Sequence, residues 1–280
     1  ITTVTFDYSG IVPANACVSR TSLTSVTISN TITSIGQSAF SGCTFVTTIA
    51  IPDTVTTIGD SAFADATNLA AVTLGSNLVT IGDSAFRNIS LTTITIPASL
   101  TTIGSNAFQN TDLTQVLFTG VSQLTTLASY VFADCSNLTS FAIPASTLSI
   151  ESFAFTNSGI TSISIPNSVT TIGDSAFKGS TSLTQITVGT GLVFGNIGEN
   201  VCESCTALVT VTLNSQVPAS FFNLVTSITS ATFDYTGAIL ANTCLGWTLL
   251  TSGLTIGTSI TSIGENAFKS SGLTTVSIPN

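Results

Sequence analysis

The side chains with the greatest capacity for chemistry are the six cysteines. Cys202 and Cys205 form a C-x-x-C pair, a spacing that both redox sites and zinc sites use. Zinc is disfavoured, because the chain has no histidine and no second C-x-x-C pair to complete a set of four ligands. The sequence favours buried thiols that act as small hydrophobic groups, with a Cys202–Cys205 disulfide as the main alternative.

A row of carboxylates offers a second kind of chemistry. An acidic residue follows an Ile-Gly pair five times, at Asp60, Asp83, Asp174, Glu199 and Glu265. If these side chains stack along one edge, their oxygens are ligands that Ca²⁺ accepts. The alternative is that each side chain caps a short helical turn, a role that Asn and Ser fill equally well. The capping role is favoured, and the sequence predicts no metal site.

No pattern of catalytic residues is evident. Without histidine, the usual nucleophile–base pairs lack their base. The glycine-rich segment GTGLVFGNIG at 189–198 lacks the lysine of a phosphate-binding loop and is interpreted as a looser corner. The sequence therefore predicts no catalytic residue, no cofactor and no enzymatic activity.

The charge composition excludes some partners. Only 6% of the residues are charged, with four basic against thirteen acidic, and the net charge is −9. So few cations cannot neutralise a row of phosphates, which excludes nucleic acid and disfavours an anionic membrane surface. Serine, threonine, asparagine and proline interrupt the apolar stretches, so no membrane span is predicted.

The strands and turns that must position these residues are encoded by a repeated sequence. The letters IGDSAF occupy 58–63, 81–86 and 172–177, and near copies recur along the whole chain. Taking the last letter as an anchor, successive anchors lie 20 to 25 residues apart. The anchors are Cys17, Phe40, Phe63, Phe86, Phe108, Phe132, Phe155, Phe177, Cys202, Phe222, Cys244 and Phe268. A regular period of this length indicates a solenoid of stacked units, here called coils.

Each coil has a half that reads as a strand and a half that reads as a turn. Leu69, Val72 and Leu74 show the strand pattern, with apolar residues alternating against small polar ones. An Ile-Pro or similar pair then ends the strand, an Ile-Gly pair turns the chain, and SAF is expected to form a short helical or 3₁₀ turn. Stacking predicts one column of rings: Phe40, Phe63, Phe86, Phe108, Phe132, Phe155, Phe177 and Phe268.

Two segments carry a family resemblance. LTTITIPASLTTIGSNAF at 91–108 and ITSISIPNSVTTIGDSAF at 160–177 resemble the BspA-like, or Treponema pallidum-type, leucine-rich repeat. The resemblance implies a leucine-rich repeat solenoid, here of about twelve coils of ~23 residues. Its parallel β-sheet would form the concave face, and the Phe column would lie on the convex side. It also implies a secreted or surface-anchored protein that acts in adhesion or protein binding.

The residues that alternate with the buried set form the candidate interaction face. They are small, uncharged and rich in hydroxyl groups, without the aromatic and charged anchors of most protein-binding surfaces. The face is represented by Ser25, Thr27, Thr93, Thr95, Ser162, Ser164, Thr210 and Thr212. A plain solvated sheet, a glycan-binding face, a self-association face and an ice-binding face all remain open.

A longer repeat lies over the short one. Residues 1–17 and 228–244 share ten of seventeen letters at an offset of 227. The sequence predicts one solenoid over 1–280, composed of a ten-coil block at 1–227 and the start of a second copy at 228–280. This longer repeat favours a structural function as the alternative, in which copies of the chain associate head to tail in an extracellular filament or surface layer.

The favoured function is a non-enzymatic extracellular or cell-surface protein for adhesion or protein interaction. Its expected partners are proteins or glycans at a surface, or copies of itself.

Overall fold

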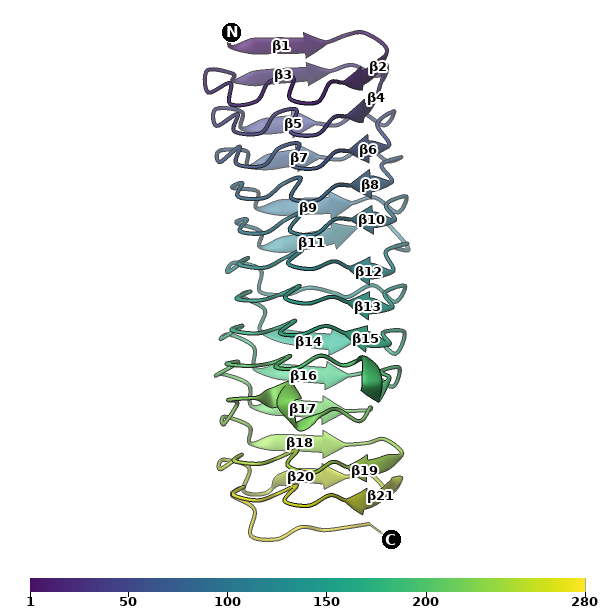
Figure 1. Ribbon diagram of the computed structural model, residues 1–280, viewed down its shortest axis with the longest axis vertical. Helices are drawn as coiled ribbons and strands as arrows, with labels where there is room; N and C mark the ends of the chain where they lie inside the picture. Colours follow the sequence, from purple (N-terminus) through teal and green to yellow (C-terminus); the bar gives the residue numbers. More distant parts are fainter. Residues whose placement is uncertain (280) are drawn as a thin grey trace. The chain divides into compact units, whose positions relative to one another are not determined.

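A computed structural model describes residues 1–279. They form two compact units, one over residues 1–138 and one from residue 139 onward. Each unit is a parallel β-solenoid, and the chain makes about 11 turns of ~23 residues (Figure 1). The predicted solenoid is confirmed.

The predicted strands form parallel sheets in which each residue lies beside its equivalent in the next coil. In the first unit, Val4 pairs with Val26 and Ile94 pairs with Val116. The paired strands are β1 (Thr3–Phe6) with β3 (Ser25–Ile28), β5 (Thr48–Ala50) with β7 (Ala71–Thr73), and β9 (Thr93–Ile96) with β11 (Gln115–Phe118). In the second unit one sheet contains β14 (Ser162–Ile165), β16 (Gln185–Val188), β17 (Thr210–Leu213), β18 (Ser230–Phe233) and β20 (Gly253–Ile256).

A second set of short strands follows, which the sequence did not predict. In several coils the threonine and isoleucine before the glycine, expected as part of a turn, pair with the same residues of the neighbouring coil. In the first unit these strands are β2 (Gly10–Val12), β4 (Ile32–Ile35), β6 (Thr57–Ile58), β8 (Thr80–Ile81), β10 (Thr102–Ile103) and β12 (Thr126–Leu127). In the second unit they are β13 (Ser149–Ile150), β15 (Thr171–Ile172), β19 (Gly237–Ile239) and β21 (Ile260–Ile263). Within each unit, most coils are therefore held to a neighbour at two places.

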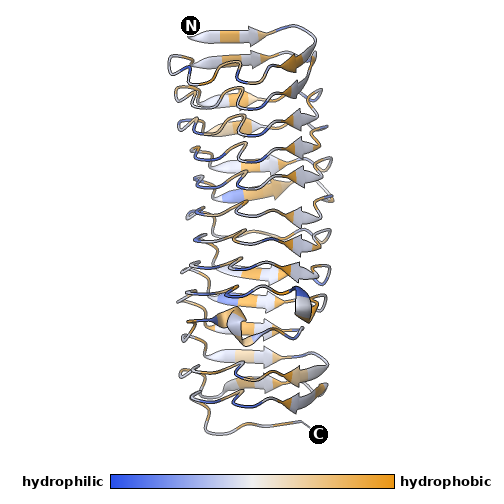
Figure 2. Cartoon of the chain, in the orientation of Figure 1, coloured by the Kyte–Doolittle hydropathy of each residue, from blue (hydrophilic) through white to orange (hydrophobic). Residues whose placement is uncertain are grey.

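The core of each unit is a set of apolar columns, visible as the repeated orange positions of Figure 2. In the first unit the rings of Phe40, Phe63, Phe86, Phe108 and Phe132 are buried and stack in sequence. Their centroids lie 5.2 to 5.7 Å apart and their planes are within 14° of parallel. These are offset stacks, because the separation is too large for face-to-face contact.

In the second unit the column is less regular. Phe155 and Phe177 stack at 5.4 Å, and Cys202 then occupies the anchor position. Phe222 meets the buried Trp247 edge to face, with ring centroids 5.5 Å apart. Phe268, in the last coil, is only half-buried.

The SAF segments are turns, so the prediction of helical or 3₁₀ turns is wrong for most coils. Two residues of most of these turns adopt positive φ, as in Ser61 (54°) and Asp65 (60°) on either side of Phe63. Left-handed backbone excludes a helix, and Asn, Asp, Ser and Gly tolerate it better than bulky residues do. In the described residues, 3₁₀ helices are restricted to η1 (Phe194–Asn196) and η2 (Ala219–Phe222).

Candidate functional site

The row of carboxylates binds neighbouring coils together. Asp60 accepts a hydrogen bond from the amide of Asp83 at 2.9 Å, and Asp83 accepts one from the amide of Ser105 at 2.7 Å. Asp174 likewise accepts from the amide of Glu199 at 2.8 Å. The predicted helix-capping role is therefore wrong for Asp60, Asp83 and Asp174, because each of these side chains accepts a bond from the next coil and no local helix exists. Residues 1–279 contain no group of three side chains placed to hold a metal ion.

The cysteines are buried free thiols. Three of them lie three residues after an anchor and donate an S–H bond to the anchor carbonyl of the preceding coil. The thiol of Cys43 lies 2.9 Å from the carbonyl of Cys17, and that of Cys205 lies 3.2 Å from the carbonyl of Phe177. Ser180 makes the same bond to Phe155 at 2.9 Å. This position therefore selects a small donor, which explains its cysteines without catalysis.

Burial also favours the protonated form of several of these thiols. It raises the pKa of Cys135 to about 11, and it raises the pKa of Cys202 and of Cys244 as well. Only the thiolate is a nucleophile. We therefore expect Ellman's reagent at pH 8 to label none of the six cysteines in the native protein and all six in guanidinium chloride. Labelling of only four in denaturant without reductant would reveal a disulfide.

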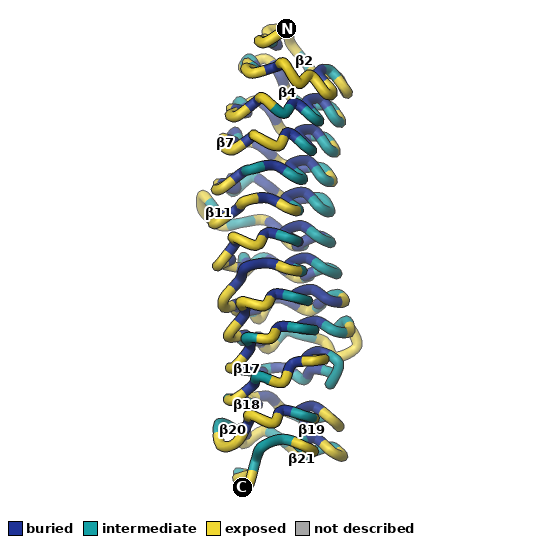
Figure 3. Tube along the Cα trace, turned by 90° about the vertical axis from the view of Figure 1, so that its left-hand side faces the viewer, coloured by how far each residue is buried: buried dark blue, intermediate teal, exposed yellow. Residues whose placement is uncertain are grey.

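The candidate interaction face follows the strands, and Figure 3 shows exposed positions alternating with buried ones along the trace. Ser25, Thr27, Thr93 and Thr95 are exposed in the first unit, and Ser162 and Ser164 are exposed in the second. Thr210 and Thr212 are half-buried. None of these eight hydroxyl groups makes a side-chain hydrogen bond within residues 1–279, so they are available to a ligand.

The strand register arranges the hydroxyl groups in rows. In the second unit Ser164, Thr187, Thr212, Thr232 and Thr255 lie side by side on five consecutive strands. Neighbouring strands are about 4.8 Å apart, so the row repeats at that spacing. The face is a regular, uncharged array of hydroxyl groups.

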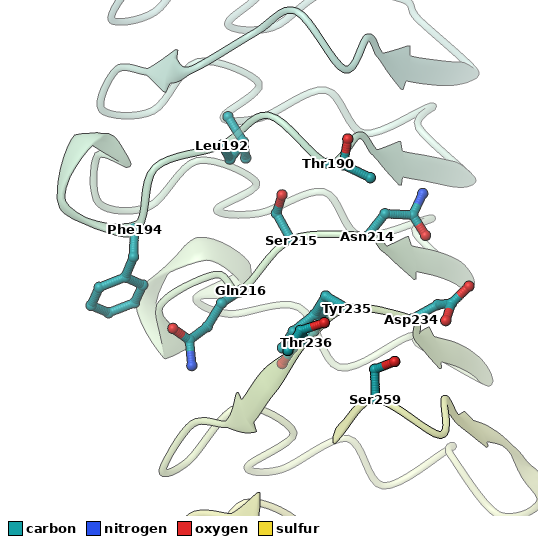
Figure 4. A pocket seen from close by; sticks show the side chains of 10 residues that line it. All are labelled: Thr190, Leu192, Phe194, Asn214, Ser215, Gln216, Asp234, Tyr235, Thr236 and Ser259. Carbon is teal, nitrogen blue, oxygen red and sulfur yellow. The ribbon is translucent and has the colours of Figure 1, made fainter. Parts of the chain in front are cut away.

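A pocket of about 500 Å³ interrupts this regularity in the second unit. It lies where the strands β16, β17 and β18 end, and ten side chains line it (Figure 4). They are Thr190, Leu192, Phe194, Asn214, Ser215, Gln216, Asp234, Tyr235, Thr236 and Ser259. The sequence predicts only a looser corner at 189–198 and no site there.

A signal for the pocket was present in the sequence. The residue after the strand is a proline or glycine in most coils, as at Pro52, Pro97, Pro166 and Gly189. Asn214 and Asp234 occupy this position in two adjacent coils. Two polar side chains where the frame calls for proline or glycine mark a local departure from the repeat.

None of the helices in the described part of the chain is long and apolar enough to cross a bilayer.

Comparison with solved structures shows the same architecture in bacterial proteins. A leucine-rich repeat protein from Bacteroides ovatus is 25% identical with a TM-score of 0.69, and the match covers 99% of this chain and 75% of that protein. A leucine rich cell surface protein from Faecalibacterium prausnitzii is 22% identical with a TM-score of 0.52, over 91% of this chain and 73% of that one.

No curated protein matches the sequence significantly. The model of the BspA type leucine rich repeat region matches in six copies, over residues 11–124, 117–219 and 196–280. Stacked parallel coils, a recurrent SAF turn and this match agree, and the chain therefore belongs to the BspA type leucine rich repeat family.

Proposed function

We propose that this chain is a non-enzymatic extracellular or cell-surface protein that mediates adhesion or protein interaction. The observation that carries the proposal is the register-aligned row of hydroxyl groups on β14, β16, β17, β18 and β20, which have no partner within the described residues. Membership of the BspA type family supports an interaction role, and the similarity to a bacterial cell surface protein is consistent with a surface location. Leucine-rich repeats are scaffolds whose function lies in the surface they carry.

Binding of the purified chain to an array of matrix proteins and neutral glycans tests this proposal. We expect at least one specific ligand, with binding reduced about tenfold or more when Ser164 and Thr255 are both replaced by Glu, because two charges then interrupt the neutral row. The matched control replaces the exposed turn residues Thr181 and Ser182 by Glu and is expected to bind normally. Silence of the folded protein across the whole array would contradict an adhesive role.

A second candidate function is self-association into a filament or surface layer. The favouring observation is that the chain carries the same coil twice, at residues 1–17 and 228–244, with ten of seventeen letters shared.

The two copies share their local geometry as well as their letters. The Tyr8 hydroxyl donates to the carbonyl of Ile11 at 3.2 Å, and the Tyr235 hydroxyl donates to the carbonyl of Ala238 at the same distance. The strand register shifts after Gly10 in one copy and after Gly237 in the other. Equal geometry means that the two copies can occupy equivalent places in a repeating array.

Sedimentation velocity over a range of concentrations tests this candidate. Head-to-tail contacts that do not close produce open chains, so we expect a sedimentation coefficient that rises with concentration. A monomer at the highest concentrations reached would refute self-association of this chain.

A further inference from the structure

Three departures from the repeat converge on the pocket in the second unit. The coil that ends at the Cys202 anchor is the longest, 25 residues from the previous one, and the next coil is the shortest, with 20. The extra length of the first forms η1, which holds Phe194 48% exposed on the pocket. In a repeat scaffold, places where local rules are broken are where function is expected.

The second departure supplies polar groups that project freely. Val188, Leu213 and Phe233 are aligned in the sheet, so the residues after them stack as well. Asn214 and Asp234 thus lie on adjacent coils, and Figure 4 shows them on one side of the pocket with Phe194 on the other. Neither side chain makes a hydrogen bond within residues 1–279, so both head groups can serve a ligand.

The third departure is a set of side chains that hydrogen bonds hold in place between those two sides, where they form the floor of the pocket. Ser215 is buried and donates to the carbonyl of Gly189 at 2.7 Å. Gln216 donates through Nε2 to the carbonyl of Ala238 at 2.7 Å, and Tyr235 donates to the same carbonyl at 3.2 Å. Side chains fixed in this way keep the pocket preformed, as small-molecule sites usually are.

The lining chemistry selects the class of ligand. No lysine or arginine lines the pocket, and Asp234 is its one ionisable carboxyl, so an anion is disfavoured. A lone carboxylate with no second acidic side chain also falls short of what a metal ion requires. The remaining groups are amides and hydroxyls, which donate and accept hydrogen bonds, beside the exposed ring of Phe194. A sugar ring presents hydroxyl groups and a weakly polarised C–H face. The aromatic ring of Phe194 complements that C–H face.

We propose that this pocket binds a neutral saccharide of one or two rings. Asn214 and Asp234 hydrogen-bond adjacent sugar hydroxyls, and Phe194 contacts the C–H face of the ring. The volume of about 500 Å³ lies in the range of small-molecule sites. The proposal rests on the proposed adhesive role and adds to the hydroxyl row a second site, with a neutral saccharide as its ligand class.

Saturation-transfer NMR of the full chain with glucose, galactose, mannose and N-acetylglucosamine, followed by titration of their disaccharides, tests the site. We expect at least one of these sugars to bind. Phe194→Ser, Asn214→Ala and Asp234→Ala should each weaken binding about tenfold. The matched controls are Phe45→Ser and Asn30→Ala, which alter an exposed ring and an exposed amide of the first unit and should bind like the parent chain. Because Phe194 is exposed, its variant tests the pocket without disturbing the core.

Asp234→Asn separates a sugar from a cationic side chain of a protein partner. The amide retains a hydrogen-bond acceptor, so sugar binding should fall only about threefold and should not change with salt. A ligand held by charge would instead lose binding as fully as with Asp234→Ala and would weaken at high salt, which would overturn the saccharide assignment. Saccharide binding that all three pocket variants retain would also overturn it. Binding to matrix proteins but to none of the sugars would overturn the saccharide site and leave the adhesive role. Binding to neither matrix proteins nor sugars would overturn both proposals.

Discussion

Replacing Phe86 with alanine is expected to destabilise the protein by about 3–5 kcal/mol. The Phe86 side chain is fully buried and stacks between Phe63 at 5.3 Å and Phe108 at 5.5 Å. Its removal leaves a cavity in the middle of the ring column and deprives both neighbouring rings of a contact. Because solenoid stability couples neighbouring coils, the loss should extend to the coils on either side.

Urea denaturation, followed by circular dichroism, measures this loss. Thr93→Ala serves as the control, since Thr93 is exposed on β9 and its hydroxyl has no partner in the described residues. A surface substitution of this kind should change the free energy of unfolding by no more than about 0.5 kcal/mol. Equal effects of the two substitutions would show that the ring column does not hold the first unit together.

Replacing Gly82 with alanine should cost about 3 kcal/mol, although only one methyl group is added. A Cβ at this position would lie 2.6 Å from the amide nitrogen of Asp60 and 2.8 Å from the carbonyl carbon of Gly59. Real Cβ atoms do not approach backbone atoms so closely, so the two coils would have to separate. Separation also stretches the bond from the Asp83 amide to Asp60, which is 2.9 Å long.

Gly195 provides a matched control. A Cβ at Gly195 would meet no atom within 4 Å, and neither glycine has a φ in the left-handed region. Gly195→Ala should therefore change the free energy of unfolding by about 0.5 kcal/mol or less. If thermal unfolding finds Gly82→Ala as mild as Gly195→Ala, close packing between coils cannot be the reason for the glycine of the IG pair.

The sequence predicted the parts of the fold that depend on burial. Leu91, Ile94 and Ile96 follow the apolar pattern that predicts a strand with one buried face, and all three are buried. The period placed equivalent residues side by side, and the register of β9 with β11 shows this directly. Burial determines whether a position is apolar or polar, and the period is the spacing at which these types recur. Both are therefore visible in the sequence.

The parts that depend on contacts between coils could not be predicted so well. Asp60 before SAF looks like a helix cap, because capping and bonding to the next coil both select a short acceptor. Ser61 and Asp65 look like helix-turn residues, because their left-handed backbone leaves no apolar pattern. The two-residue strand Thr57–Ile58 is too short to alternate visibly. The pocket could not be predicted from the repeat, because Asn214 and Asp234 depart from it and so belong to no recurring pattern.

Strict register has a consequence for how such a protein can change in length. Residues at equivalent positions meet their own kind in the neighbouring coil, as Ile81 meets Ile58 and Ile103. After insertion or deletion of one whole coil, every remaining contact between coils therefore still joins residues of the same kind. The length of the unit changes by about 4.8 Å. Unequal recombination between copies of the repeat would thus yield foldable products at once. The reach of the molecule can be adjusted in evolution by a change of copy number, without the redesign of any core.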